Sequence, residues 1–435
     1  MFSDQTHLRA ARNIFEHLAE QLDTRLSIRL WDGSIVPLGR HADPARCIAI
    51  RGPGVLGSLL RRPTLETLLR HYATGRIDFE GGDLLTFITL AREKKIKIKW
   101  QHLRKGFLLK HALPLFFAFE DNRRLAHAYA GDETGRQRTH GEETGFIQFH
   151  YDIGNDFYAL FLDAEMQYSC AYFTDWGNSL EQAQTDKLEM ICRKLRLQPG
   201  DRFLDIGCGW GGLLCHAATH HGVTAHGVTL SQAQHDYTAE KIRRLGLEDR
   251  VTVELRNYEN LDGEYDKISS IGMVEHVGIA NYPAYFGKLN RLLRDRGLLL
   301  NHGITRRAKR GHRKGHKTPP EKKLLLKHIF PGSELDHLGH TLEAMETEGF
   351  EIHDVEGWRE HYAQTCRLWH QRLVANSDKA IAQIGLEKYR MWIAYLAGVA
   401  FGFNDGALRL YQILATKQKA KGPSAMAPTR ADLYR

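Results

Sequence analysis

One run of residues joins a strand-ending acid to a glycine-rich turn. From Phe203 to Gly212 the chain has the spacing D-x-G-x-G-x-G-G, with apolar residues before Asp205 and four glycines after it. Such glycines let backbone N–H groups approach a ligand where a parallel strand ends and a helix begins. Because no lysine follows them as a P-loop requires, the run favours S-adenosylmethionine (SAM) over a nucleotide phosphate. An ordinary tight turn is the alternative, although four glycines are costly to keep without a ligand.

Two further segments place ionisable side chains directly after predicted strands. Glu275 and His276 follow a strand that ends near Gly272, and an acid beside an imidazole can handle a proton or an anion. A solvated pair of loop residues is the alternative there. His302 comes at the end of another apolar strand, where a satisfied core histidine is the alternative.

Other segments offer contacts for a bound ligand. At the end of the second strand, Thr229 and Gln234 stand where many Rossmann-type sites carry an acid that grips ribose hydroxyls. Glu259, past the third strand, is placed to approach an adenine. The aromatic-rich runs 150–158 and 168–173 suit a lid over an apolar substrate, and a helical cap with buried tyrosines is the alternative.

Most of these residues lie at the ends of strands that alternate with helices. The pattern predicts strands at 202–206, 224–229, 251–255, 267–272, 297–302 and 350–356, and helices at 212–221, 232–245 and 282–293. This order indicates the α/β class, a doubly wound parallel sheet of the Rossmann-like kind with its site at the carboxyl ends of the strands. A long helical pattern at 386–416 carries Gly398, Gly402 and Gly406 on one face, which predicts close packing of that face.

The first hundred residues predict a smaller α+β domain. The patterns there indicate helices at 4–23, 64–73 and 84–91, strands at 25–31, 35–38 and 46–50, and a closing turn at 78–82. Asp32-Gly33 is a hairpin signal between the first two strands. We therefore expect an N-terminal domain at 1–100, a linker at 101–145 that contains a basic apolar helix, a catalytic domain at 146–420 and a tail at 421–435.

The composition of the chain indicates its cellular compartment and the kinds of partner it can bind. The chain has 435 residues, a formal net charge of +8, and no apolar run that reaches the roughly 20 residues of a membrane span. No secretory signal is visible, and the six cysteines form no C-x-x-C pair, so we expect reduced thiols, a cytoplasmic protein and no metal. The positive charge suits nucleic acid or an acidic lipid surface. In the loop 306–317, nine of twelve residues are Lys, Arg or His, which favours docking on phospholipid headgroups over a merely solvated loop.

Together these motifs resemble the cyclopropane-fatty-acyl-phospholipid synthases and the related mycolic acid cyclopropane synthases. The resemblance rests on H-Y-D-x-G-N-D-F-Y, Y-S-C-A-Y-F, L-D-I-G-C-G-W-G-G, E-H-V-G and H-G-I, and covers about residues 146–416. It implies a SAM-dependent methyltransferase that adds the methyl carbon of SAM to a cis double bond of a phospholipid acyl chain. A bound bicarbonate then removes a proton from the resulting carbocation and the ring closes. Peripheral association with the inner face of the membrane and a possible homodimer are also implied.

The resemblance assigns roles to individual residues. The bicarbonate would be held by Cys170 and Ile304 through backbone N–H groups, and by the side chains of Glu275, His302 and Tyr362. SAM would be held by Tyr168, Ser169, Asp205, Gly207, Cys208, Gly209, Gly211, Thr229, Leu230, Gln234, Tyr258 and Glu259. Cys170 would then act through its backbone and not as a nucleophile.

Three alternatives differ from cyclopropane formation. A related fatty-acyl C-methyltransferase would give a methyl or methylene branch from the same cation. A nucleic-acid methyltransferase would carry N/D-P-P-Y or Pro-Cys after the fourth strand, where this chain has Val-Glu-His-Val-Gly, so we expect no nucleic-acid partner. A non-catalytic lipid-binding protein would suit the N-terminal domain alone.

Overall fold

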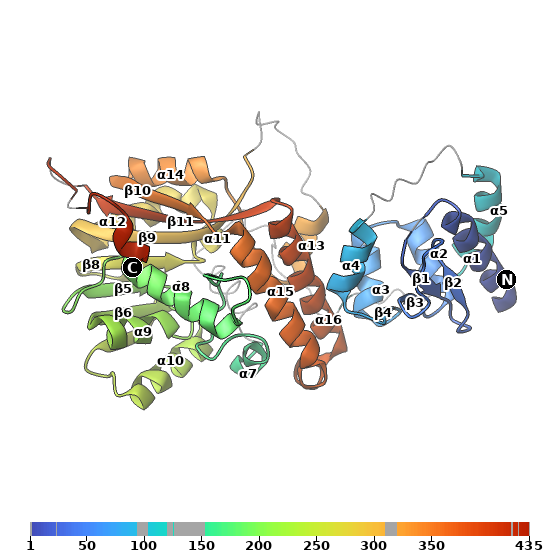
Figure 1. The fold of residues 1–435 in the computed structure, drawn as a ribbon, viewed down its shortest axis with the longest axis horizontal. Helices are drawn as coiled ribbons and strands as arrows, with labels where there is room; N and C mark the ends of the chain where they lie inside the picture. Colours follow the sequence, from blue (N-terminus) through green and yellow to red (C-terminus); the bar gives the residue numbers. More distant parts are fainter. Residues whose placement is uncertain are drawn as a thin grey trace. The chain divides into compact units, whose positions relative to one another are not determined.

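The computed structural model divides into two compact units (Figure 1). It describes residues 2–22, 24–93, 103–119, 125, 153–308, 320–418, 421–424 and 426–434. The smaller unit comprises residues 1–128, 317–328 and 373–397, and the larger unit comprises 129–316, 329–372 and 398–435. The expected boundaries near 100, 145 and 420 stay predictions, because each adjoins residues outside the described ranges.

A four-stranded sheet organises the smaller unit, in the order β2-β1-β3-β4. Its strands are β1 (Ser27–Arg29), β2 (Ile35–Pro37), β3 (Cys47–Ile50) and β4 (Ile77–Glu80). Its helices include α1 (Asp4–Ala19), α2 (Pro53–Arg61), α3 (Leu65–Ala73), α4 (Leu84–Glu93), α5 (Lys105–Phe116) and α13 (Pro320–His328). The hairpin at Asp32-Gly33 is confirmed by the antiparallel pairing of β1 with β2. The turn expected at 78–82 is wrong, because residues 77–80 pair with β3 and the chain turns only after them.

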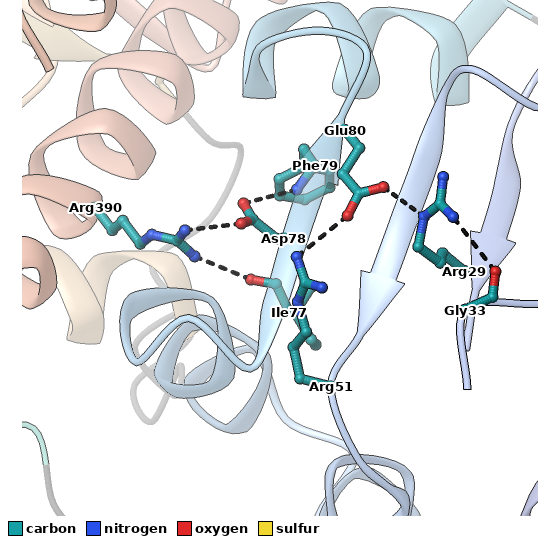
Figure 2. Close-up of polar contacts among 8 residues, drawn as sticks. All are labelled: Arg29, Gly33, Arg51, Ile77, Asp78, Phe79, Glu80 and Arg390. Carbon is teal, nitrogen blue, oxygen red and sulfur yellow. Dashed lines mark hydrogen bonds and ion pairs between the residues drawn. The ribbon is translucent and has the colours of Figure 1, made fainter. Parts of the chain in front are cut away.

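Charged pairs on β4 explain why residues from late in the chain belong to the smaller unit (Figure 2). Glu80 accepts from Arg29 Nε at 2.6 Å and from Arg51 at 3.2 Å. Arg390, on α16 (Ser377–Asn404), pairs with Asp78 at 3.0 Å and donates to the Ile77 carbonyl at 3.2 Å. Arg390 thus contacts both a side chain of β4, that of Asp78, and its backbone, at the Ile77 carbonyl.

A seven-stranded sheet forms the larger unit, in the order β10-β11-β9-β8-β5-β6-β7. Its strands are β5 (Arg202–Ile206), β6 (Thr224–Thr229), β7 (Val251–Leu255), β8 (Tyr265–Ile271), β9 (Leu293–Arg306), β10 (Phe350–Gly357) and β11 (Leu408–Lys417). Strands β9, β8, β5, β6 and β7 are mutually parallel, while β11 runs antiparallel to both β9 and β10. The predicted Rossmann-like α/β class is confirmed, with one antiparallel strand, β11, inserted between the edge strand β10 and β9.

Helices cover both faces of this sheet. Its helices are α7 (Asn155–Ala159), α8 (Leu180–Lys194), α9 (Gly212–His221), α10 (Gln232–Leu245), α11 (Val274–Val277), α12 (Tyr282–Leu292), α14 (Leu338–Thr347) and α15 (Arg359–Ala375). Neighbouring residues of β5 point to opposite faces: Phe203 packs in the core under α8 and α9, and Leu204 in the core under α12 and α14. In the described part of the chain, no helix combines the length and apolarity that a membrane crossing needs.

The long C-terminal helix expected at 386–416 is wrong in its second half. Helix α16 ends at Asn404, Gly406 turns the chain with φ of 72°, and the next residues form β11. Because β11 has a strand on each side, it is apolar along most of its length, and such a run cannot be told from a buried helix by periodicity. Of the three glycines expected to pack closely, only Gly402 does, since a Cβ there would lie 2.9 Å from Leu408. The expectation is wrong for Gly398 and Gly406, where a Cβ would meet nothing within 4 Å.

Candidate functional site

A cavity opens where β5, β6 and β8 end. Its lining contains most of the residues expected to hold SAM: Tyr168, Ser169, Asp205, Gly207, Cys208, Gly209, Thr229, Leu230, Gln234 and Tyr258. The rest of the lining is Met166, Gln167, Ile206, Trp210, Leu213, Val228, Arg256, Ile271, Gly272, Met273, His276, Val277 and Pro331. Gly211 and Glu259 lie next to lining residues in the chain but do not line the cavity. The carboxyl edge of the parallel strands is therefore where this fold leaves space for a ligand.

The glycines after β5 have different tasks. Gly207, Gly209 and Gly211 all have positive φ, at 74°, 56° and 73°. A Cβ on Gly207 would lie 2.3 Å from Met273 Sδ, and one on Gly211 would lie 2.4 Å from Thr238 Cγ2. A Cβ on Gly209 would meet nothing within 4 Å. Gly207 and Gly211 are thus required because a side chain at either position would clash with Met273 or Thr238. At Gly209 the missing side chain leaves open space in the cavity wall.

Polar side chains on the cavity wall are held by one another. Asp205 accepts from Ser269 Oγ at 2.6 Å, and burial raises the pKa of its carboxyl to about 6. Thr229 donates to Gln234 Oε1 at 2.9 Å, which fixes the neutral pair that sequence analysis noted after β6. The side chains of Asp205, Thr229 and Gln234 are therefore held in fixed orientations by hydrogen bonds within the protein.

Helix α8 supplies two residues that sequence analysis missed. Lys187 is fully buried and donates to Ser169 Oγ at 3.0 Å and to Gln167 Oε1 at 2.5 Å. Gln184, one turn earlier, donates to the carbonyls of Gln167 at 3.2 Å and Ser169 at 3.0 Å. Burial lowers the pKa of Lys187 to about 8. The sequence signal that could have identified these two residues is a lysine and a glutamine three positions apart on the otherwise apolar face of a predicted helix.

The aromatic segment before the sheet is packed against the cavity wall over its described length, and its role as a lid over a substrate stays a prediction. Phe157 and Tyr158 on α7 are buried, and the Tyr158 ring packs against those of Trp210 at 5.0 Å and Tyr168 at 5.3 Å. Asn155 accepts from Trp210 Nε1 at 2.8 Å and donates to the Ala233 carbonyl at 3.2 Å. The segment therefore ties the glycine turn to α10, and its first residues, 150–152, lie outside the described ranges.

A second group of predicted residues gathers around β9. Glu275 Oε1 accepts from the backbone N–H of Ile304 at 2.5 Å, and His302 lies two residues earlier on the same strand. In this arrangement the Ile304 N–H orients Glu275. None of Cys170, Glu275, His302, Ile304 and Tyr362 lines the cavity, but Glu275 lies between Met273 and His276, which both do.

Trp358, which sequence analysis did not identify, brings the remaining predicted residues together. Its carbonyl accepts from Tyr362 N at 3.1 Å and contacts Cys170 Sγ at 3.8 Å, and its ring meets the His302 ring edge-on at 5.6 Å. The Cys170 thiol is fully buried, which raises its pKa well above the usual range. Such a thiol is a poor nucleophile because little of it ionises.

Several buried polar atoms on or beside β9 lack hydrogen-bond partners within the described residues, among them Asn301 Oδ1 and Thr305 Oγ1 on the strand itself. Two belong to the predicted ionisable residues. Within the described residues, Glu275 Oε2 and His302 Nε2 have no hydrogen-bond partner. Burial raises the pKa of Glu275 to about 7 and lowers that of His302 to about 3. An unsatisfied buried polar atom costs about 1–3 kcal/mol, so this pair points to a small polar ligand.

A hydrogen-bonded chain decides which nitrogen of His302 carries the proton. Lys194 Nζ, which also pairs with Glu356, donates to Gln412 Oε1 at 2.7 Å. Because an ammonium only donates, the carbonyl of Gln412 faces Lys194 and its NH₂ donates to His302 Nδ1 at 3.0 Å. Neutral His302 therefore carries its proton on Nε2, the nitrogen without a protein partner.

Comparisons with known proteins identify relatives over most of the chain. Residues 138–413 match the family model described as mycolic acid cyclopropane synthetase. A probable fatty acid methyltransferase from Pseudomonas putida is 37% identical over 420 residues, which cover 96% of this chain and 98% of that protein. The cyclopropane-fatty-acyl-phospholipid synthase of Escherichia coli K12 is 35% identical over 322 residues, covering 74% of this chain and 78% of that protein. The crystal structure of the mycolic acid cyclopropane synthase CmaA1 complexed with SAH and CTAB matches with a TM-score of 0.60 at 35% identity, covering 64% of this chain and 99% of that one.

Buried Glu275 should make the protein less stable as the pH rises. Its pKa is about 7 when folded, against an ordinary value of 4.5, so between these pH values the folded chain keeps a proton that the unfolded chain has lost. The free energy of unfolding therefore falls through this window, by up to about 3 kcal/mol. Glu275→Gln keeps an acceptor for Ile304 N–H and should remove this loss, being more stable than the wild type at pH 8 and similar at pH 4.5.

Urea unfolding of both proteins at the two pH values measures the difference. Glu248→Gln, at an exposed glutamate, is the control and should keep the wild-type pH dependence. A wild-type slope in Glu275→Gln would contradict the buried, raised-pKa carboxyl.

Proposed function

The chain belongs to the mycolic acid cyclopropane synthetase family, and from this premise we propose that it transfers the methyl carbon of SAM to a cis double bond of an unsaturated phospholipid acyl chain and closes a cyclopropane ring. The observation that carries the proposal is the pair of buried, partnerless atoms Glu275 Oε2 and His302 Nε2 beside a cavity with a glycine wall. The cavity would hold the methyl donor, and the two partnerless atoms would bind the group that receives the proton lost on ring closure.

SAM would occupy the cavity lined by the ends of β5, β6 and β8. Gly209 would give its backbone room beside the cofactor, and the fixed Thr229–Gln234 pair would face it from β6. Lys187 and Gln184 would act indirectly, by holding Ser169 and its neighbours in place. Gly211 and Glu259 do not line the cavity. Gly211 would allow the start of α9 to pack closely against Thr238, and Glu259 would act from its position after β7.

The donors near β9 fit a bicarbonate ion, which when bound would supply the base that takes a proton from the transferred carbon. Glu275, whose raised pKa of about 7 keeps it protonated below that pH, would donate from Oε2 while Ile304 N–H holds Oε1. His302 would donate from Nε2, because Gln412 occupies Nδ1. Two neutral donors bind an anion without adding a buried negative charge beside it.

Aromatic rings would protect the cationic stage of the reaction. Tyr362 stacks on Phe403 at 4.5 Å, and the Trp358 side chain is completely buried beside His302. Such rings exclude water that would trap a carbocation, and their faces stabilise positive charge. Cys170 would contribute its backbone and a small, un-ionised side chain.

A second function is favoured by the relative from Pseudomonas putida, whose printed name is probable fatty acid methyltransferase. In that case the same cation would lose a different proton and give a methyl or methylene branch. Incubation with SAM and monounsaturated phospholipid vesicles, followed by fatty-acid methyl ester analysis, separates the two. A product about 14 mass units heavier that still contains an olefin would count against the cyclopropane.

We propose that the protein acts at the inner face of the membrane and that helix α5 contacts the bilayer. Leu109, Leu113 and Phe119 in and just after this helix are 71%, 55% and 71% exposed. Arg104 and Lys105 at its start are exposed too. Large exposed apolar side chains beside cations suit an interface with anionic headgroups. Most of the basic loop 306–317 lies outside the described residues, and its role in docking, like a homodimer, remains a prediction.

Filling the open wall at Gly209 should block cofactor binding. Gly209→Ala puts a methyl group into the cavity wall at a left-handed φ, so we expect at least a tenfold loss of affinity for S-adenosylhomocysteine by isothermal titration calorimetry. Gly246→Ala is the matched control: Gly246 has φ of 65°, its Cβ would also meet nothing within 4 Å, and it does not line the cavity. Both variants should lose about 1 kcal/mol of stability. Equal affinities in the two variants would refute the assignment of this wall to the cofactor.

Removing either donor near β9 should stop turnover and spare cofactor binding. Glu275→Leu and His302→Leu, which carry no donor, are expected to lower kcat at least about 100-fold, because the anion that takes the proton loses one of its binding groups. Affinity for S-adenosylhomocysteine should stay within about threefold of the wild type, since neither side chain lines the cavity. The vesicle assay measures the first quantity and calorimetry the second. Normal turnover in both variants would rule out this anion site.

Charging the exposed face of α5 should weaken binding to vesicles. Leu109→Asp combined with Leu113→Asp is expected to reduce co-sedimentation with phosphatidylglycerol vesicles at least tenfold, because each leucine loses about 1.5–3 kcal/mol of apolar burial. Leu245→Asp, at a leucine on α10 that is 48% exposed, is the control and should bind normally. Unchanged binding of the double variant would place the bilayer contact elsewhere.

A further inference from the structure

Three side chains that could bind a metal meet between α8 and α9. Cys192 on α8, and His216 and His221 on α9, each offer one ligand atom, and these atoms all lie within 4.8 Å of one another. Cys192 is buried, while the side chains of His216 and His221 are 12% and 17% exposed. In sequence the thiol and the imidazoles are more than twenty residues apart, so no metal-binding spacing is visible.

A carboxylate lies at the same place. Glu189, one turn before Cys192 on α8, has its Oε2 atom 3.4 Å from His216 Nε2 and 3.0 Å from His221 Nε2. Its other oxygen, Oε1, accepts from Arg193 Nε at 2.8 Å. The two imidazoles thus converge on one oxygen, whose carboxylate is oriented from behind by an arginine.

We propose that Cys192, His216, His221 and Glu189 form a binding site for a thiophilic divalent metal ion of the zinc class. Zinc takes Cys, His and carboxylate ligands in a tetrahedron with bond lengths of about 2.0–2.3 Å, which puts the ligand atoms about 3.3–3.8 Å apart. The distances from Glu189 to the two imidazoles already fall near this range. The ligand atoms of Cys192, His216 and His221 lie within 4.8 Å of one another and have to close in around the metal.

On binding, the Cys192 thiol loses its proton to solvent and the sulfur lone pair forms the bond to the metal. Each histidine contributes the lone pair of one ring nitrogen, and Arg193 keeps its hydrogen bond to Glu189 Oε1 as the outer support of the site. Four protein ligands leave no open position, so the site is structural and not catalytic.

The position of the cluster indicates what the metal does. Helix α8 holds the cavity wall through Gln184 and Lys187, and α9 begins at the glycine turn. None of the four ligands lines the cavity. A metal bound here clamps α8 to α9 and stabilises the framework of the cavity without touching the reacting atoms. The inference does not depend on the proposed function.

Metal titration of the untagged, full-length protein tests the site. After treatment with a chelator and dialysis, the wild type should take up one equivalent of Zn²⁺ and show a higher Tm. With Co²⁺ it should show sulfur-to-metal charge transfer in the near ultraviolet and the d–d bands of a tetrahedral site. Cys192→Ser should lose the charge-transfer band and weaken zinc binding at least about 100-fold.

Cys215→Ser is the matched control, because Cys215 is also a buried thiol, lies on α9 and is outside the cluster. It should keep the stoichiometry, the spectrum and the Tm shift. If Cys192→Ser does not fold, His216→Gln combined with His221→Gln, with its fold checked by circular dichroism, takes its place. The proposal is overturned if the folded wild type takes up no stoichiometric zinc, or if zinc binding survives unchanged in the cysteine or double-histidine variant.

Discussion

The site depends on the position of β9 between β8 and β11. The parallel register with β8 sets Ile271 opposite His302, so the turn after β8 returns Glu275 to the backbone N–H of Ile304. The antiparallel register with β11 sets Gln412 opposite His302, so an amide lies within reach of the imidazole. One strand thereby positions both of the ionisable groups: a shift of β9 by a single residue would turn His302 to the opposite face of the sheet and move the Ile304 N–H away from Glu275.

Helix α8 connects these groups to the cavity by means of two buried lysines. Lys187 and Lys194 lie two turns apart, and each is almost completely buried. Lys187 donates to Ser169 on the cavity wall, and Lys194 donates to Gln412, which in turn orients His302. Burying a lysine is costly unless its ammonium is paired or hydrogen-bonded. Lys194 pairs with Glu356 and Lys187 is held by hydrogen bonds to Gln167 and Ser169. A single helix therefore orients both the wall of the cavity and the proton position of His302.

Much of the fold followed from the sequence, and so did the family resemblance, which the comparisons confirm. The strands β5 to β8 and the helices after β5 and β6 were predicted to within a few residues, because their patterns are bounded by glycine and polar turns. The prediction failed at β11, where a strand flanked on both sides looks like a buried helix. It also missed Trp358 and Lys187, because a lone tryptophan or lysine in a helical or strand pattern carries no local sign of its partners.

The local chemistry could be predicted from residue types alone: the glycine turn after Asp205, the neutral residues Thr229 and Gln234, and the presence of Glu275 and His302 at strand ends. These follow from residue types and short spacings, which depend only on neighbouring residues. The packing of distant elements was needed to show that Glu275 and His302 are desolvated, that Gln412 selects the tautomer of His302, and that Cys192 meets two histidines of another helix. Each of these rests on contacts between residues 24 to 110 positions apart, and such contacts come into being only when strands and helices pack.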